Sequence, residues 1–121
     1  MSSAESFFEF SQNLQQKVLQ INRTALAHAG EAVGRSLAGG GVLHVFGSGH
    51  SSIVAQELVH RAGGLACVSA IIDQSHGLAE KVVGYGRRVA ERYQLSYGVE
   101  SGECVIVVSN SGKNPAPVEV A

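Results

Sequence analysis

The sequence predicts an α/β fold, a three-layer αβα sandwich in which a parallel sheet lies between two layers of helices. Short apolar runs of strand length alternate with helical patterns, and glycine-rich stretches separate them. Such alternation is typical of parallel strands joined by helical crossovers. The chain has 121 residues, of which 45% are hydrophobic, so it can bury the modest core of a single domain.

Residues 4–37 are predicted to form a long amphipathic helix. Apolar residues recur along it at spacings of three and four, and three glycines at positions 39–41 end the pattern. We assign residues 1–40 to an N-terminal helical segment and residues 41–121 to the core of the same domain. The helix is long for a small domain. We therefore expect part of its apolar stripe to face a partner subunit in a homodimer or larger homo-oligomer.

The remaining elements are expected to alternate between strand and helix. Strands are predicted at residues 42–46, 65–72 and 104–108. One helix should begin at Ser51 or Ser52, either of which could cap it, and should run to about Arg61. Further helices are predicted over residues 79–95 and from Pro115 and Pro117, since proline is tolerated in a first turn. The chain stops as this last helix begins, so the domain looks incomplete at its C-terminus.

Two loops rich in serine and glycine follow the first and third predicted strands. They read Gly47-Ser48-Gly49-His50-Ser51-Ser52 and Ser109-Asn110-Ser111-Gly112-Lys113-Asn114. Each precedes a predicted helix, whose free N–H groups favour an anion, and the serine hydroxyls add donors. Ligands of open parallel sheets bind at the carboxyl ends of the strands. The two loops together therefore predict a phosphate site.

Several other classes of function do not fit the sequence. The net charge of −1 and the scattered basic residues argue against a nucleic-acid partner. No apolar run approaches the roughly 18–20 residues of a membrane span, and the N-terminus lacks a signal peptide, so we expect a cytoplasmic protein. Cys67 and Cys104 are expected to be reduced core thiols.

Common nucleotide-binding motifs are also absent from the two loops. The third glycine of a dinucleotide motif is replaced by Ser52, although Asp73 after the second strand leaves that interpretation as a weaker alternative. The Gly-Lys-Ser/Thr end of a P-loop is missing. We expect neither a redox cofactor nor a metal site.

The two loops resemble the phosphosugar-binding loops of the sugar isomerase (SIS) domain family. The first is similar to the family's Gly-x-Gly-x-Ser turn and the second to its Ser-x-Ser-Gly-x-Thr loop, with Asn114 at the threonine position. The resemblance to a little-characterised branch of the family extends through Glu57-Leu58 and residues 61–64. It implies a five-stranded parallel sheet, of which this chain would be the first part, and a phosphorylated sugar as ligand. The resemblance implies that Ser51, Ser109 and Ser111 bind the phosphate, with Gly112 and Asn114 close to it. It leaves open whether Ser48 also binds the phosphate.

Three residues are candidates for acid–base chemistry on such a sugar. The imidazole of His50 could act as a general acid or base, Glu57 could abstract a proton beside a carbonyl, and His76 could reach a ligand across a subunit boundary. Two of them have plainer interpretations: a loop residue facing solvent for His50, and a helix-surface pair with Arg61 for Glu57. His28 and His44 are expected to be structural.

The function predicted first is phosphosugar binding by an isomerase, which interconverts an aldose and a ketose, or by a related phosphosugar-converting protein. A non-catalytic module that senses a phosphosugar and regulates a protein partner is the alternative. A dimeric scaffold with vestigial loops is the third interpretation.

Overall fold

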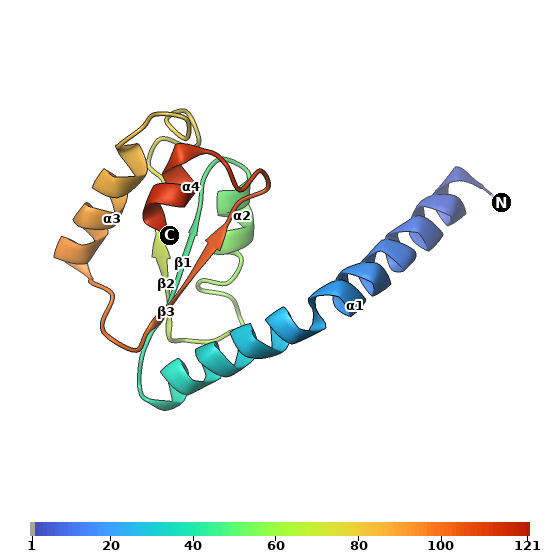
Figure 1. Cartoon of the computed structure of the whole chain (residues 1–121), viewed down its shortest axis with the longest axis horizontal. Coiled ribbons are helices and arrows are strands. Elements are labelled where there is room, and N and C mark those ends of the chain that lie inside the picture. Colours follow the sequence, from blue (N-terminus) through green and yellow to red (C-terminus); the bar gives the residue numbers. More distant parts are fainter. Residues whose placement is uncertain (1) are drawn as a thin grey trace. The chain divides into compact units, whose positions relative to one another are not determined.

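The computed structural model describes residues 2–121, and its elements follow the order α1, β1, α2, β2, α3, β3, α4 (Figure 1). The chain divides into two compact units; the first ends at Ala32 and the second comprises Val33–Ala121. Helix α1 covers Ser3–Ala38, close to the predicted range. Within residues 2–121 no helix is both long enough and apolar enough to cross a bilayer.

A capping box begins α1. The Ser2 N–H donates to Glu5 Oε2 at 2.6 Å, and the Glu5 N–H donates to Ser2 Oγ at 3.3 Å. The reciprocal bonds satisfy two donors that the first helical turn leaves free. They also hold the pKa of Glu5 below its ordinary value, with the backbone bond from Ser2 as the main cause.

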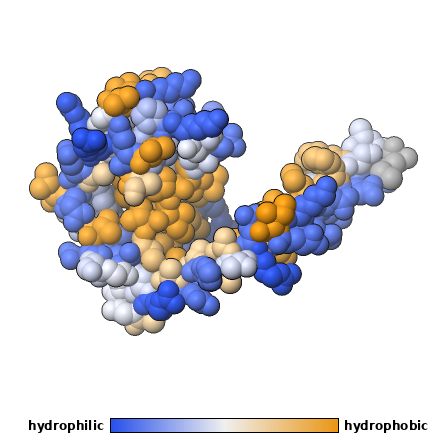
Figure 2. Space-filling model, viewed as in Figure 1, coloured by the Kyte–Doolittle hydropathy of each residue, from blue (hydrophilic) through white to orange (hydrophobic). Residues whose placement is uncertain are grey.

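The second unit is built on a three-stranded parallel sheet in the order β2-β1-β3. Strand β1 (Leu43–Gly47) is buried throughout, while β2 (Val68–Ile71) and β3 (Cys104–Val108) lie at the two edges. Figure 2 shows apolar side chains gathered in the middle of this unit, over β3, where Val105 and Ile106 are exposed.

Helices cover both faces of the sheet, which confirms the predicted three-layer architecture. Helix α2 (Ser51–Gln56) lies on one side of the sheet and α3 (Tyr85–Ser96) on the other (Figure 1). Helix α4 (Pro115–Val120) packs against α3. Side chains of β1 alternate between the layers, as a strand requires. Val45 packs with Ala55 of α2, and Phe46 packs with Tyr93 of α3.

Two helices are shorter than predicted. Helix α2 ends at Gln56 rather than near Arg61. Residues 57–60 form turns and bends, and the left-handed φ of 55° at His60 is incompatible with a helix that continues to Arg61. Helix α3 begins at Tyr85, whereas the sequence predicted residue 79. Gly77 and Gly84 both have a φ of 88° and turn the intervening chain instead.

The predicted caps and one strand also differ in the structure. The N-cap of α2 is His50, without a side-chain cap, and Ser52 Oγ donates to the Gly49 carbonyl at 2.6 Å. The capping role predicted for Ser51 or Ser52 is therefore wrong. Strand β2 spans Val68–Ile71, inside the predicted range of 65–72.

A series of hydrogen-bonded polar side chains is buried near the start of β1. His44 Nδ1 lies 2.7 Å from the Tyr93 hydroxyl, and His44 Nε2 lies 2.8 Å from Glu103 Oε2. Glu103 also accepts the N–H groups of Glu100 and Val42. Chiefly the bond from Glu100, together with those from His44 and Val42, lowers the pKa of Glu103 to about 2. His44 is thus part of the core framework.

Candidate functional site

The first loop leaves β1 through a glycine that tolerates no side chain. A Cβ at Gly47 would lie 2.4 Å from the Ser51 carbonyl oxygen and 2.5 Å from the Ser51 carbonyl carbon. Only glycine allows the backbone to turn so closely against the start of α2. Gly49, two residues on, has a left-handed φ of 55°. This geometry places Ser48 in a buried position at the sheet edge.

The buried carboxylate of Asp73, which follows β2, holds this loop in place. Asp73 Oδ2 accepts the N–H of Gly77 at 2.9 Å and the N–H of Gly49 at 3.4 Å. Asp73 Oδ1 accepts both donors of Ser75 and the hydroxyl of Tyr85. Burial by itself raises the pKa of Asp73, but the hydrogen bonds from Ser75, Tyr85 and Gly77 outweigh it and keep the pKa below its ordinary value. Asp73 is therefore an ionised clamp on the first loop.

The second loop is more exposed and is held by local bonds over residues 109–113. Ser109 Oγ accepts the Gly112 N–H at 3.0 Å, and Ser111 Oγ accepts the Lys113 N–H at 3.3 Å. These are turns in which a hydroxyl replaces a backbone carbonyl as acceptor. Each serine keeps its own O–H proton, which remains able to donate to another group.

The two loops meet because β1 and β3 pair in parallel. Gly47 at the end of β1 lies opposite Val108 at the end of β3, so both loops leave the sheet at the same edge. Between them lies a cavity of about 220 Å³. Its lining residues come from both loops and from the turn before α3: Ser48, His50, Ser51, Glu80, Ser109, Asn110, Ser111 and Asn114. The structure thus brings together every predicted phosphate-binding side chain; Gly112 directly follows Ser111.

Two lining residues were not predicted as site residues. Asn110 at least lies in the second predicted loop, whereas Glu80 lies outside both loops. Its Oε2 accepts from Ser48 Oγ at 3.2 Å, and its Oε1 accepts from Asn114 Nδ2 at 3.0 Å. Its carbonyl also accepts the Ala116 N–H at 3.0 Å. Glu80 therefore joins the first loop to the second. The only available signal was an acidic residue between Gly77 and Gly84, and the predicted helix over 79–95 concealed it.

Two of the three predicted acid–base residues lie outside this cavity. Glu57 is exposed and its carboxylate pairs with Arg61, as the plainer interpretation has it. His76 is exposed in the turn after β2, with a left-handed φ of 51°. His50 does line the cavity and is also exposed to solvent.

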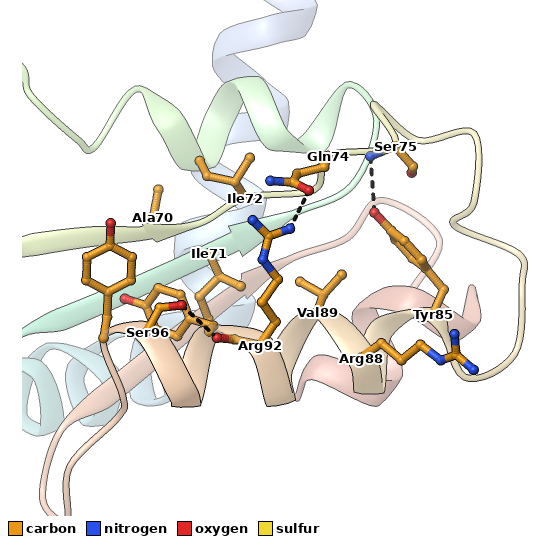
Figure 3. A pocket seen from close by; sticks show the side chains of 12 residues that line it. Ala70, Ile71, Ile72, Gln74, Ser75, Tyr85, Arg88, Val89, Arg92 and Ser96 are labelled. Atoms are coloured by element: carbon orange, nitrogen blue, oxygen red, sulfur yellow. Dashed lines mark hydrogen bonds between the residues drawn. The ribbon is translucent and has the colours of Figure 1, made fainter.

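A larger cavity of about 580 Å³ lies between β2 and α3 and contains none of the predicted site residues. Figure 3 shows its polar and apolar sides. Arg92 reaches Gln74, and the Ser75 N–H donates to the Tyr85 hydroxyl at 3.1 Å. Ile71 and Val89 form an apolar floor. Because Tyr85 and Ser75 also bond Asp73, this cavity borders the clamp of the first loop.

Comparisons with known proteins agree on one family. The family model described as SIS domain matches residues 6–121. The UPF0309 protein of Caldanaerobacter subterraneus is 49% identical over 85 residues, which are 66% of this chain and 35% of that protein. The UPF0309 protein of Listeria innocua is 32% identical over 121 residues, covering 96% of this chain and 49% of the relative. That of Streptomyces avermitilis is 36% identical over 129 residues, covering 98% and 50%. The chain spans about half the length, or less, of these curated relatives.

Proposed function

The chain belongs to the SIS domain family, in which phosphosugar binding is the shared property, and from this we propose that it binds a phosphorylated sugar between its two loops. The observation that carries the proposal is the cavity into which hydroxyl groups of both loops converge. A phosphate monoester carries nearly two negative charges and needs several donors. Ser51, Ser109 and Ser111 supply such donors without a basic cluster.

We propose that the phosphate sits at the end of the cavity formed by the second loop. There the O–H protons of Ser109 and Ser111 are free to donate, because their oxygens accept from the loop backbone. Gly112 and Asn114 belong to the same loop and complete the predicted phosphate-binding set. Ser51 adds a donor from the first turn of α2.

For a reaction we propose aldose–ketose isomerisation, in which a proton moves between neighbouring carbons of the sugar. His50 is the predicted acid–base residue that lines the cavity, so it is the first to test. Glu57 and His76 remain predicted participants that would act from outside this cavity.

The alternative is a module that senses a phosphosugar without converting it. The position of Glu57 favours this alternative, because its carboxylate is exposed and paired with Arg61 rather than directed at the loops. Both functions use the same phosphate site, and they differ in whether a base reaches the sugar.

A thermal-shift panel of sugar phosphates, each matched with its unphosphorylated sugar, tests the binding proposal. Ligands that bind the native state raise the Tm by mass action. We expect selective shifts that are lost in the double variant S109A/S111A and kept in the control Ser101→Ala, which removes an exposed hydroxyl from the turn before β3, at the opposite end of that strand from the second loop. Unchanged shifts in the double variant would contradict the site. With a ligand in hand, deuterium uptake from D2O at the carbon beside the carbonyl separates the isomerase from the sensor, and His50→Ala should abolish it.

We also propose that the protein self-associates through α1. Large apolar side chains of this helix are exposed, among them Phe7 at 66% and Ile21 at 82%. Contiguous exposed apolar surface marks interaction sites. Sedimentation that shows a monomer at high concentration would refute self-association.

A further inference from the structure

Glu80 is the only acidic side chain among the described residues that line the loop cavity. A carboxylate beside a phosphate site needs an explanation, because two negative groups in a confined space repel each other. Glu80 is half-buried, and both of its oxygens are engaged. Hydrogen bonds to both loops therefore fix the position of the Glu80 carboxylate.

The bonds of Glu80 change the roles of two predicted phosphate ligands. Ser48 Oγ donates to Glu80 Oε2 and Asn114 Nδ2 donates to Glu80 Oε1. A hydroxyl has a single proton to donate, so Ser48 cannot serve the carboxylate and a phosphate oxygen together. Asn114 Nδ2 carries two protons, so it keeps one N–H when the other is bonded to Glu80. The donors left for a phosphate are therefore the hydroxyls of Ser51, Ser109 and Ser111 and this second N–H of Asn114.

We propose that Glu80 accepts hydrogen bonds from hydroxyl groups of the sugar and so determines which phosphorylated compounds bind; this inference rests on the proposed function. An ionised carboxylate is an acceptor only, with about four lone-pair sites. Two of these sites are used by Ser48 and Asn114, and the others can accept sugar hydroxyls through charge-assisted hydrogen bonds. The cavity then has a phosphate end at the second loop and a sugar end at Glu80.

This division selects a substrate class. Neutral polyhydroxylated sugar monophosphates offer hydroxyl donors to Glu80 and bind. Phosphorylated sugar acids and sugar bisphosphates carry a second anion toward Glu80 and are rejected by like-charge repulsion. Inorganic phosphate fills only the phosphate end and does not depend on Glu80.

The test compares Glu80→Gln with the unsubstituted protein by calorimetric titration. The ligands are a panel of hexose 6-phosphates and pentose 5-phosphates, 6-phosphogluconate and inorganic phosphate. We expect the Kd of the bound sugar phosphates to rise about tenfold or more, as loss of a charged hydrogen bond predicts. The Kd of inorganic phosphate should stay within about twofold or fall, and discrimination against 6-phosphogluconate should shrink.

Controls separate folding from recognition. Glu91→Gln removes the same charge from an exposed position of α3 and should leave all affinities unchanged. If Glu80→Gln does not fold, Glu80→Asp keeps the charge, shortens the reach to both loops, and should give the same split between sugar phosphate and phosphate. Equal changes for sugar phosphates and inorganic phosphate would overturn the inference and leave the phosphate site intact. Binding of no sugar phosphate by the unsubstituted protein would overturn the proposed function and this inference with it.

Discussion

The two serine-glycine loops share a composition but differ in how they are held. The first is anchored by a buried carboxylate after β2 and turns through a glycine without room for a Cβ. The second is exposed, and its hydroxyls accept bonds from its own backbone. At its end the second loop is bonded to Glu80 through Asn114. The first loop is therefore part of the framework, whereas residues 109–113 of the second are free to adjust.

This difference assigns separate tasks to similar residues. A loop held from several directions gives a fixed wall against which a ligand is positioned. A loop held by local turns can reorganise its donors around an anion at small cost in stability. Substitutions that release the first loop should therefore mainly lower the stability of the protein. Substitutions in the second loop should mainly lower ligand binding.

The largest expected effect comes from removing the clamp of the first loop. Asp73→Ala leaves the N–H groups of Gly49 and Gly77 and the hydroxyl of Tyr85 without their acceptor. Unsatisfied buried groups cost about 1–3 kcal/mol each, and such costs add only partly. We expect a loss of about 3 kcal/mol in the free energy of unfolding, measured by urea denaturation. If the free energy of unfolding falls no more than in the exposed variant Glu91→Gln, Asp73 does not stabilise the first loop.

A matched pair of glycine substitutions gives the next effect. Gly47→Ala forces a Cβ to 2.4 Å from the Ser51 carbonyl, so the backbone must shift, and we expect about 2 kcal/mol of destabilisation. Gly112→Ala meets no atom within 4 Å and is strained only by its φ of 63°, at about 1 kcal/mol. Thermal unfolding of both variants measures the contrast. If they lose equal stability, the first loop is not the tighter one.

Acid should act on the first loop and on the opposite end of β1. The folded-state pKa values of Asp73 and Glu103 both lie below their ordinary values, that of Glu103 at about 2. A depressed pKa contributes stability that is present above the unfolded value and is lost as the pH falls through the folded one. The Tm should therefore fall between about pH 4.5 and pH 2. Glu103→Gln should flatten this part of the profile, and an unchanged slope would contradict the assignment.

The smallest effect on stability is expected at the second loop. The double variant S109A/S111A removes two acceptors from exposed N–H groups that water can satisfy. Surface changes of this kind stay within about 0.5 kcal/mol. Urea denaturation of the double variant should thus match the unsubstituted protein even though phosphosugar binding is lost. A loss comparable to that of Asp73→Ala would show that both loops belong to the framework.

The parts of the fold that sequence predicts well are those with local causes. The apolar period of α1 and the β-branched run of β3 act within their own segments, and both elements appear close to their predicted bounds. Strand β1 is shifted by one residue from its predicted range of 42–46 and spans Leu43–Gly47.

The parts that it misses depend on contacts from elsewhere in the chain. Gly84 and Arg87, at the start of α3, donate their N–H groups to Glu119 of α4, a residue 35 positions after Gly84. No residue close to position 84 in the sequence indicates this cap. Glu80 was missed for a related reason, because its partners Ser48 and Asn114 lie 32 and 34 positions away. Motif reading found the loops, whereas the residue between them became visible only in three dimensions.

The bonding of Tyr85 gives the protein a built-in optical reporter. The chain contains no tryptophan and three tyrosines, so its intrinsic near-ultraviolet emission comes from phenol rings alone. The Tyr85 hydroxyl donates to the Asp73 carboxylate at 2.7 Å, a contact that quenches phenol emission by drawing on its proton. Any event that separates the Tyr85 hydroxyl from the Asp73 carboxylate should therefore brighten the protein without a dye being attached.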